Sequence, residues 1–209
     1  MLYAIAHFLR DKMPWLWDLV DIINSMIFSL RYGSKLIAVE KNVFETYNKE
    51  YKVARLRDVD TDKLVKFFAA QPKEAYTFFK PHRFDKASIK KLQRNKAFLA
   101  YILLDVDSHS TSSGQAGSPT EIVAYCFNRS FFYGKGFRGR MVGIDYRGKG
   151  LGILMNKILN EIGFGIGMHL YETVSKDNVA SYRSVISASN FKVIEELPHN
   201  ELYLEILPE

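Results

Sequence analysis

Hydrophobic and polar positions near the start of the chain follow a helical period. From Leu16 onward, apolar residues recur at the i, i+3, i+4 and i+7 spacing, and polar residues lie off that stripe: the apolar ones are Leu19, Val20, Ile23, Ile27 and Leu30, and the polar ones are Asp18, Asp21 and Asn24. The pattern predicts an amphipathic helix that ends at Gly33, within an N-terminal helical extension of residues 1–45. Because carboxylates are costly inside lipid, we do not expect this helix to span a membrane.

The apolar stripe of that helix has three possible partners, and the sequence leaves them open. It could cover one edge of its own domain, contact another protein or a second copy of the chain in a homodimer, or lie on a membrane surface with the help of Trp15 and Trp17. The apolar stretch 1–9 is short and has no small-residue cleavage site, so it does not read as a signal peptide.

The remaining chain, residues 51–209, alternates between strand and helix patterns and predicts a second region. Alternating or continuous apolar runs predict strands, and capped 3.6-residue patterns predict helices. The expected strands are 52–58, 97–106, 121–127, 137–144, 168–174, 191–197 and 202–207, and the expected helices are 61–70, one from about 85, 153–164 and one headed by Asn178 and Ser181. This order indicates an α/β (α+β) domain with a mixed sheet.

Composition narrows the class of protein only a little. The formal net charge of +6 fits a polyanionic ligand, but no block of Lys and Arg is dense enough to indicate nucleic acid. Cys126 is the single cysteine, which excludes an internal disulfide framework, and its apolar surroundings indicate an inert buried thiol. We therefore expect a reducing compartment, the cytoplasm, and no metal site.

Two further features are given ordinary structural roles. His109 lies in a polar loop, 107–120, with nothing nearby in sequence to make it a ligand or a base. Residues 134–139 match G-x-G-x-x-G, but a strand follows them where a dinucleotide site needs a helix, so they are interpreted as a hairpin turn.

The most informative stretch is the turn between strand 137–144 and helix 153–164. It contains Arg147, Gly148, Lys149, Gly150, Leu151 and Gly152. Glycine permits a tight turn and a close approach of the backbone to a ligand, and the first N–H groups of the following helix point into the turn with two cationic side chains beside them. The stretch predicts a pyrophosphate-binding loop, and its spacing differs from that of a P-loop NTPase.

Two motifs in order identify a likeness to a known superfamily. Arg147, Gly150 and Gly152 match [Q/R]-x-x-G-x-[G/A]. Farther along, a strand, a helix headed by Asn178, and a further strand that follows Asn190-Phe191 resemble strand five, helix four and strand six of the same superfamily. Over residues 51–207 the chain resembles the GNAT acyltransferases. The resemblance implies a mixed central sheet of about six to seven strands, with splayed strands four and five, flanked by helices.

The resemblance also implies a binding site for acetyl-CoA as acyl donor. Residues 147–152 would hold the pyrophosphate, the backbone amides of Arg140 and Val142 would face the pantetheine arm and the thioester oxygen, and Asn178 with Ser181 would contact pantetheine at the head of the next helix. Asn178 would also serve as an ordinary helix cap. The aromatic and basic segment 71–96 would either wall the acceptor site or supply core residues and a solvated helix face.

Proton transfer is where the chain departs from the superfamily. Ser184, Val185, Ile186 and Ser187 occupy the region where many members carry a tyrosine as general acid, and the strand glutamate used as base in some members falls on Thr173. Tyr182, one turn earlier, and Glu172, one residue away on the strand, are the remaining candidates for catalysis.

The function expected from this resemblance is an N-acetyltransferase working by direct attack. The acceptor would be a primary amine of a small molecule, with an amino sugar or a nucleotide-linked amino sugar as one option, and no covalent enzyme intermediate or metal would be needed. Two alternatives remain open: a catalytically silent acyl-CoA-binding module, and a transferase of longer acyl chains attached to the membrane surface.

Overall fold

The structure is a computed structural model that describes residues 14–105 and 121–208. The predicted loop 107–120 with His109, and the stretch 1–9, therefore lie outside the described residues. One sheet of seven strands organises the chain, in the order β1-β2-β3-β4-β5-β7-β6. Its strands are β1 (Tyr51–Arg55), β2 (Phe98–Asp105), β3 (Ile122–Ser130), β4 (Lys135–Val142), β5 (His169–Ser175), β6 (Asn190–Leu197) and β7 (Glu201–Leu207). This confirms the predicted mixed sheet.

The two central strands part along their length. β4 and β5 run parallel, and their backbones pair only over the first residues, from Lys135↔His169 to Phe137↔Tyr171. All other neighbouring strands in the sheet pair antiparallel. From Arg138 and Glu172 onward the two strands no longer pair, so the predicted splay of strands four and five is confirmed.

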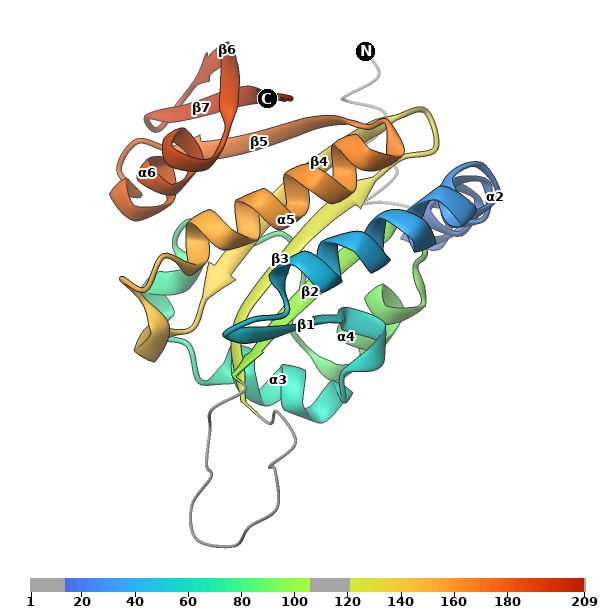
Figure 1. Cartoon of the computed structure of the whole chain (residues 1–209), viewed down its shortest axis with the longest axis horizontal. Coiled ribbons are helices and arrows are strands. Elements are labelled where there is room, and N and C mark those ends of the chain that lie inside the picture. Colours follow the sequence, from blue (N-terminus) through green and yellow to red (C-terminus); the bar gives the residue numbers. More distant parts are fainter. Residues whose placement is uncertain (1–13, 106–120, 209) are drawn as a thin grey trace, which may run out of the picture.

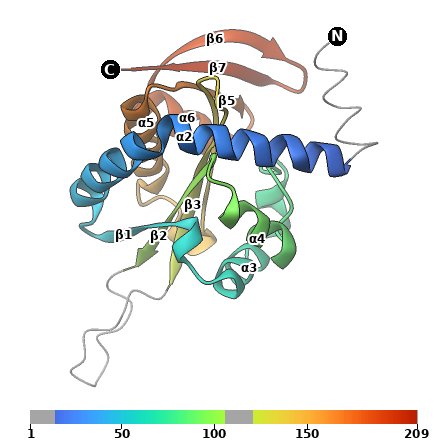
Figure 2. The same cartoon turned by 90° about the vertical axis from the view of Figure 1, so that its right-hand side faces the viewer.

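Helices cover both faces of the sheet (Figures 1 and 2). Helices α2 (Pro14–Tyr47) and α5 (Leu151–Ile166) lie on one face, while α3 (Thr61–Ala69) and α4 (Lys86–Arg94) lie on the other. Helix α6 (Val179–Ala188) follows β5 and packs beside α5. The apolar side chains between these layers form two buried clusters: the main core cluster beneath α2 and α5, and the second core cluster beneath α3 and α4.

Local sequence signals explain where several helices begin. The Asp60 carboxylate accepts from the N–H groups of Asp62 and Lys63 at the start of α3, and Asp85 accepts from Ser88 N–H at the start of α4. Both starts agree with the prediction. Helix α5 was expected over 153–164 and to end among Gly163, Gly165 and Gly167; it runs past the first two of these glycines and stops at Gly167, whose φ of 90° supplies the left-handed cap.

The N-terminal helix is longer than predicted, and the stop at Gly33 is wrong. Helix α2 continues through this glycine to Tyr47. A glycine inside a helix costs only about 1 kcal/mol relative to alanine, and the second half of α2 buries Leu36 and Val43 in the main core, which outweighs that cost. The described part of the chain contains no helix with the length and apolar character required to cross a bilayer.

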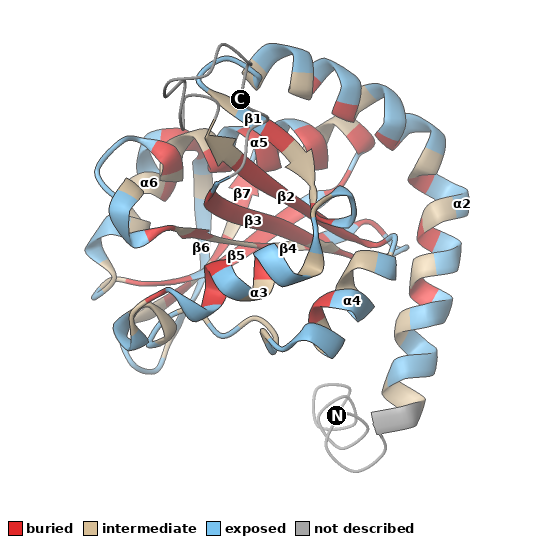
Figure 3. Ribbon diagram, turned by 90° about the horizontal axis from the view of Figure 1, so that it is seen from below, coloured by how far each residue is buried: buried red, intermediate tan, exposed pale blue. Residues whose placement is uncertain are grey.

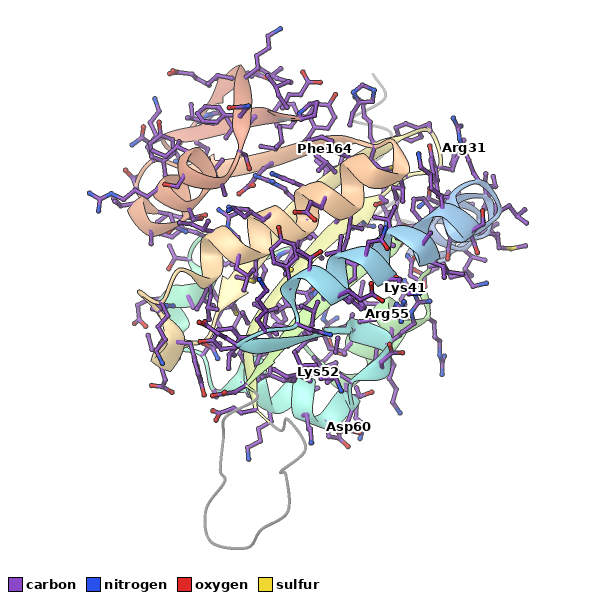
Figure 4. The ribbon with its side chains drawn as sticks, in the orientation of Figure 1. Arg31, Lys41, Lys52, Arg55, Asp60 and Phe164 are labelled. Carbon is purple, nitrogen blue, oxygen red and sulfur yellow. The ribbon has the colours of Figure 1, made fainter. Side chains whose placement is uncertain are left out.

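A buried carboxylate fastens the second half of α2 to the sheet. Glu40 is almost fully buried; its carboxylate accepts from Arg55 Nε at 2.6 Å and from the Tyr101 hydroxyl at 2.9 Å. Figure 4 shows Arg55 on β1 beneath α2. Because a buried charge needs such partners, these contacts fix the position of α2 on its own domain. The predicted stripe, however, does not make these contacts: its residues Leu19, Val20, Ile23, Ile27 and Leu30 are exposed, and α2 covers its own domain through a different face.

Candidate functional site

The predicted phosphate-binding loop joins the end of β4 to the start of α5. After β4, a short 3-10 turn (Ile144–Tyr146) leads through Arg147 to two glycines in the left-handed region, Gly148 at φ 78° and Gly150 at φ 77°. A residue with a Cβ is strained at both positions. Arg147 and Lys149 are exposed in the same turn.

The amides that begin α5 face this loop. The first bonds inside the helix are those from the N–H groups of Ile153 and Leu154 to Gly150 O, at 3.0 and 3.1 Å. The N–H groups of Leu151 and Gly152 precede them and point out of the helix end. Together with the partial positive charge of the helix terminus and two cationic side chains, this arrangement suits an anion such as a pyrophosphate.

The edge of β4 that faces β5 carries unpaired backbone groups. Gly143 N–H donates to Val123 O on β3, whereas Gly134 O accepts from His169 N–H on the β5 side. Because backbone groups alternate along a strand, Arg140 and Val142 direct theirs toward β5, beyond the last paired residues of the two strands. We call the separation between the unpaired parts of β4 and β5 the gap. Unpaired backbone groups on a strand edge are able to bond to an extended ligand as they would to an added strand.

Side chains bridge the two strands where backbone pairing stops. Arg138 Nε lies 2.6 Å from one carboxylate oxygen of Glu172, and Arg140 Nη1 lies 2.5 Å from the other. All three side chains are buried. Arg138 also donates to the side chains of Asn160 and Ser189. Two guanidiniums share one carboxylate, so this cluster carries one positive charge in excess.

The surroundings of Glu172 bear on its predicted role as a general base. Burial by itself would raise the pKa of Glu172, but Arg140 and Arg138 outweigh burial and hold the pKa below its ordinary value. Both carboxylate oxygens are already engaged by arginines. A carboxylate with a lowered pKa and occupied oxygens is a poor proton acceptor, so the structure favours a role in positioning the two arginines.

Arg140 reaches across the gap to the first turns of α6. Its Nη2 donates to Ser181 O and Ser181 Oγ at 3.0 Å, and to Ser184 Oγ at 2.9 Å. Ser184 belongs to the stretch where the resemblance places a catalytic tyrosine. A guanidinium therefore lies against the part of α6 where that hydroxyl would be expected.

The other predicted residues of α6 lie at its start. Asn178 caps the helix by accepting from Ser181 N–H at 3.3 Å. Tyr182 is half-buried and packs against the main core cluster. Val142 is half-buried at the end of β4. The structure thus brings Arg140, Ser181 and Glu172 together, and it places the loop 147–152 at the far end of β4 from the paired residues.

Sequence reasoning missed four members of the buried cluster: Arg138, Asn160, Ser184 as a contact of Arg140, and Ser189. Because side chains alternate between the two faces of a strand, the sequence does place Arg138 and Arg140 on the same face of β4, and this was the signal that could have paired them. It does not show that an arginine on that face is buried, since arginines on strands are mostly exposed.

The aromatic segment 71–96 turns mostly inward. Tyr76, Phe79 and Phe84 pack against the second core cluster, and His82 lies among aromatic rings with its Nε2 2.8 Å from the Tyr125 hydroxyl. His82 Nδ1 lies 2.9 Å from Arg83 O, a carbonyl that can only accept, so the ring donates there and accepts from Tyr125. Burial lowers the pKa of His82. These aromatic rings serve the core.

The single cysteine is buried on β3. Burial raises the pKa of Cys126 to about 12, so its thiol stays protonated near neutral pH. This agrees with the prediction of an inert thiol.

Known proteins resemble this chain in structure. A scan with family models finds no match to the sequence, and a search of the curated proteins finds none either. Among solved structures, the GNAT domain of PAT from S. lividans matches with a TM-score of 0.59 and 13% identity, over 75% of this chain and 90% of that one.

Two further structures show the same likeness. The N-acetyltransferase PseH of Campylobacter jejuni matches with a TM-score of 0.52 and 13% identity, over 75% of this chain and 97% of that one. The yncA protein of Salmonella typhimurium, whose structure includes its cofactor acetyl-CoA, matches with a TM-score of 0.54 and 14% identity, over 76% and 94% of the two chains. At these identities the likeness establishes the fold.

Proposed function

We propose that this chain, which has the GNAT fold, is an N-acetyltransferase that moves an acetyl group from acetyl-CoA to a primary amine of a small molecule. The observation that carries the proposal is the parting of β4 from β5 next to a left-handed glycine turn at the start of α5. The unpaired edge of β4 suits the amide-containing pantetheine arm of a CoA molecule, and the helix terminus that follows it along the chain suits the pyrophosphate.

Each part of the donor has proposed partners. Arg147, Lys149 and the N–H groups of Leu151 and Gly152 would hold the pyrophosphate, with Gly148 and Gly150 providing the turn. The backbone groups of Arg140 and Val142 would bond to the pantetheine arm and meet the thioester oxygen. Asn178 and Ser181 lie at the head of α6, on the opposite side of the gap.

The reaction is an addition and elimination at the thioester carbonyl. An uncharged amine nitrogen attacks the carbonyl carbon, the C–S bond breaks, the thiolate leaves, and the amine loses a proton, so that an amide and a thiol result. In this proposal the excess positive charge of the Arg138–Glu172–Arg140 cluster stabilises the departing thiolate through Arg140, while Glu172 holds that guanidinium in place. Tyr182 or solvent would then deliver the proton.

The acceptor is assigned only as a primary amine. A sugar nucleotide is less able to stack on segment 71–96 than the sequence suggested, because most aromatic rings of that segment pack in the core. An amino sugar or nucleotide-linked amino sugar remains one option within the proposed class. The catalytically silent module is a second candidate, favoured by the contact of Arg140 with Ser184 where a catalytic tyrosine would be expected.

A thiol-release assay tests the proposal. The protein is mixed with acetyl-CoA and a panel of small primary amines, and free CoA thiol is followed with a thiol-reactive dye; buried Cys126 should contribute little signal. We expect release that depends on both protein and amine. Binding of acetyl-CoA without release for any amine would favour the silent module, and absence of binding would refute the proposed function.

The role of Arg140 can be isolated within the same assay. Arg140→Met removes the positive charge that is proposed to stabilise the leaving thiolate, so we expect kcat to fall by about a hundredfold with a smaller change in acetyl-CoA affinity. Arg140→Lys keeps a charge and should recover part of that loss. A fall in acetyl-CoA affinity with unchanged kcat for both variants would show that Arg140 shapes the site and does not act on the thiolate.

A further inference from the structure

The outward face of the first half of α2 is apolar and has no cover among the described residues. Its inner side buries Asn24 and Phe28 against the sheet, yet large apolar side chains also point away from the domain. Leu30 is 87% exposed and Met26 is 62% exposed. We call this the outer face of α2; it consists of Leu19, Val20, Ile22, Ile23, Met26, Ile27 and Leu30. In Figure 3 this half of the helix stands at the margin of the molecule.

A neighbouring turn extends this apolar surface with aromatic rings. Phe132 and Tyr133, in the turn between β3 and β4, are exposed. The turn is held to α2 because the Asn24 side chain donates to Ser130 O at 3.0 Å and accepts from Phe132 N–H at 2.9 Å. Arg31, labelled in Figure 4, donates to Phe132 O at 3.3 Å. The backbone of the turn that carries the two aromatic rings is therefore fixed next to α2.

Basic residues border the outer face on the side of α4. Lys91 pairs with Asp18, and the backbone N–H of Lys96 donates to Ser25 Oγ at 2.8 Å, so the end of α4 lies along α2. Lys90, Arg94 and Lys96, at and just after the end of α4, are exposed, and Arg31 and Lys35 are exposed on α2 itself. The two acids of this half of the helix are already paired, Asp18 with Lys91 and Asp21 with Arg129. The surroundings of the outer face are thus net positive.

Charge and composition decide which partner suits this surface. A second copy meeting the same face across a two-fold axis would bring two basic borders close together. An anionic bilayer surface complements both parts, since apolar and aromatic side chains enter the boundary between headgroups and acyl chains while lysines and arginines meet lipid phosphates. The preceding residues 1–13 have the same mixed character in sequence, with Leu2, Ile5, Phe8 and Leu9 beside Arg10 and Lys12.

We propose that the outer face of α2, together with Phe132 and Tyr133, binds the surface of an anionic lipid bilayer. The chain lies on the bilayer through this surface and does not cross it. The loop that begins α5 and the first half of α2 lie at opposite ends of the molecule in Figure 1. Membrane binding therefore leaves the phosphate-binding loop accessible, and the proposal stands whether or not the chain is an acetyltransferase.

Vesicle co-sedimentation of the full chain tests this proposal. Wild type is sedimented with vesicles of phosphatidylcholine alone and with vesicles that also contain phosphatidylglycerol. We expect binding to the anionic vesicles, weaker binding to the neutral ones, and release in high salt. Met26→Glu with Leu30→Glu should lower the partition coefficient by about tenfold or more, because two apolar contacts are replaced by repelled charges. Lys90→Glu with Arg94→Glu should reduce binding to anionic vesicles only.

The controls separate lipid binding from folding and from self-association. Val193→Glu changes an exposed apolar residue on the edge strand β6 and should leave vesicle binding unchanged. Thermal unfolding shows whether each variant is folded. Wild type that stays in the supernatant with both vesicles, or an equal response of the α2 and β6 variants, overturns the proposal. A dimer that Met26→Glu and Leu30→Glu convert to a monomer, without vesicle binding, would assign the face to a second copy instead.

Discussion

At the scale of single residues, the site depends on one carboxylate held between two guanidiniums. Glu172 is buried, and its pKa is held below the ordinary value because Arg140 and Arg138 outweigh the effect of burial. A carboxyl group whose pKa is lower in the folded state binds more protons when unfolded. Its contribution to stability is therefore fully present above the unfolded pKa, about 4.3, and is lost as the pH falls through the folded pKa.

This argument predicts how Glu172→Gln changes the pH dependence of unfolding. The substitution leaves two buried guanidiniums facing each other without their shared carboxylate, so we expect a loss of about 3–5 kcal/mol at neutral pH. Below pH about 4.5 the stability of wild type should fall more steeply than that of the variant. Urea unfolding at several pH values measures both effects.

The exposed Glu195 on β6 provides the matched control. Glu195→Gln should change stability at neutral pH by no more than about 0.5 kcal/mol. Equal pH profiles for Glu172→Gln and wild type would mean that Glu172 is not ion-paired in the folded protein.

The sequence made part of this residue-scale description predictable. The loop 147–152 could be found because glycines with interspersed cations before a helix have a direct chemical meaning. The burial of Arg138 could not be found, because it depends on Asn160, Glu172 and Ser189 meeting it from three other elements. Contacts between distant segments follow from the fold and have no local signal.

At the scale of elements, helices α2 and α5 meet where a glycine permits close contact. A Cβ at Gly165 would lie 2.7 Å from Val39 Cγ1, closer than real contacts allow. We expect Gly165→Ala to destabilise the protein by about 1–2 kcal/mol, although alanine is the better helix former. In a Val39→Ala background the clash is gone, so the same change should be neutral or stabilising.

Gly33 within α2 offers the comparison for this test. A Cβ there meets only Ser29 Oγ, at an ordinary 3.6 Å. Gly33→Ala should therefore stabilise the protein by up to about 1 kcal/mol through helix propensity. Chemical unfolding of the four variants measures the coupling between the two helices. A stabilising Gly165→Ala in the wild-type background would contradict the close contact.

The same two glycines show why element boundaries were harder to predict than element types. Gly33 was interpreted as a helix end and Gly165 lies just beyond the predicted helix 153–164, yet both lie inside helices. Burial of Leu36 and Val43 extends α2, and Ile166 is buried at the end of α5. Gly167, with a φ of 90°, adopts the left-handed conformation that ends a helix, whereas Gly33 and Gly165 do not. The order of strands and helices was predictable, because the periodic spacing of apolar residues extends over a whole element and a single glycine does not change it.

At the scale of the whole molecule, the fold brings a strand edge, a helix terminus and a buried positive cluster to the gap between β4 and β5. The fold follows from the order of the elements and from its likeness to solved structures. The use of the gap for acetyl-CoA is our proposal. It requires that the loop after β4 bind the pyrophosphate, and this requirement can be examined without knowing the acceptor.

Calorimetric titration with acetyl-CoA tests that requirement most directly. Replacing Gly150 would strain the loop itself, since its φ is 77°, so charge reversal gives the cleaner variant. Arg147→Glu with Lys149→Glu places two negative charges beside the pyrophosphate, whereas Lys157→Glu reverses an exposed charge two turns into α5. We predict binding by wild type and by Lys157→Glu, and an affinity at least about tenfold lower for the double variant. Equal affinity in all three proteins, or no binding by wild type, would contradict the proposed site.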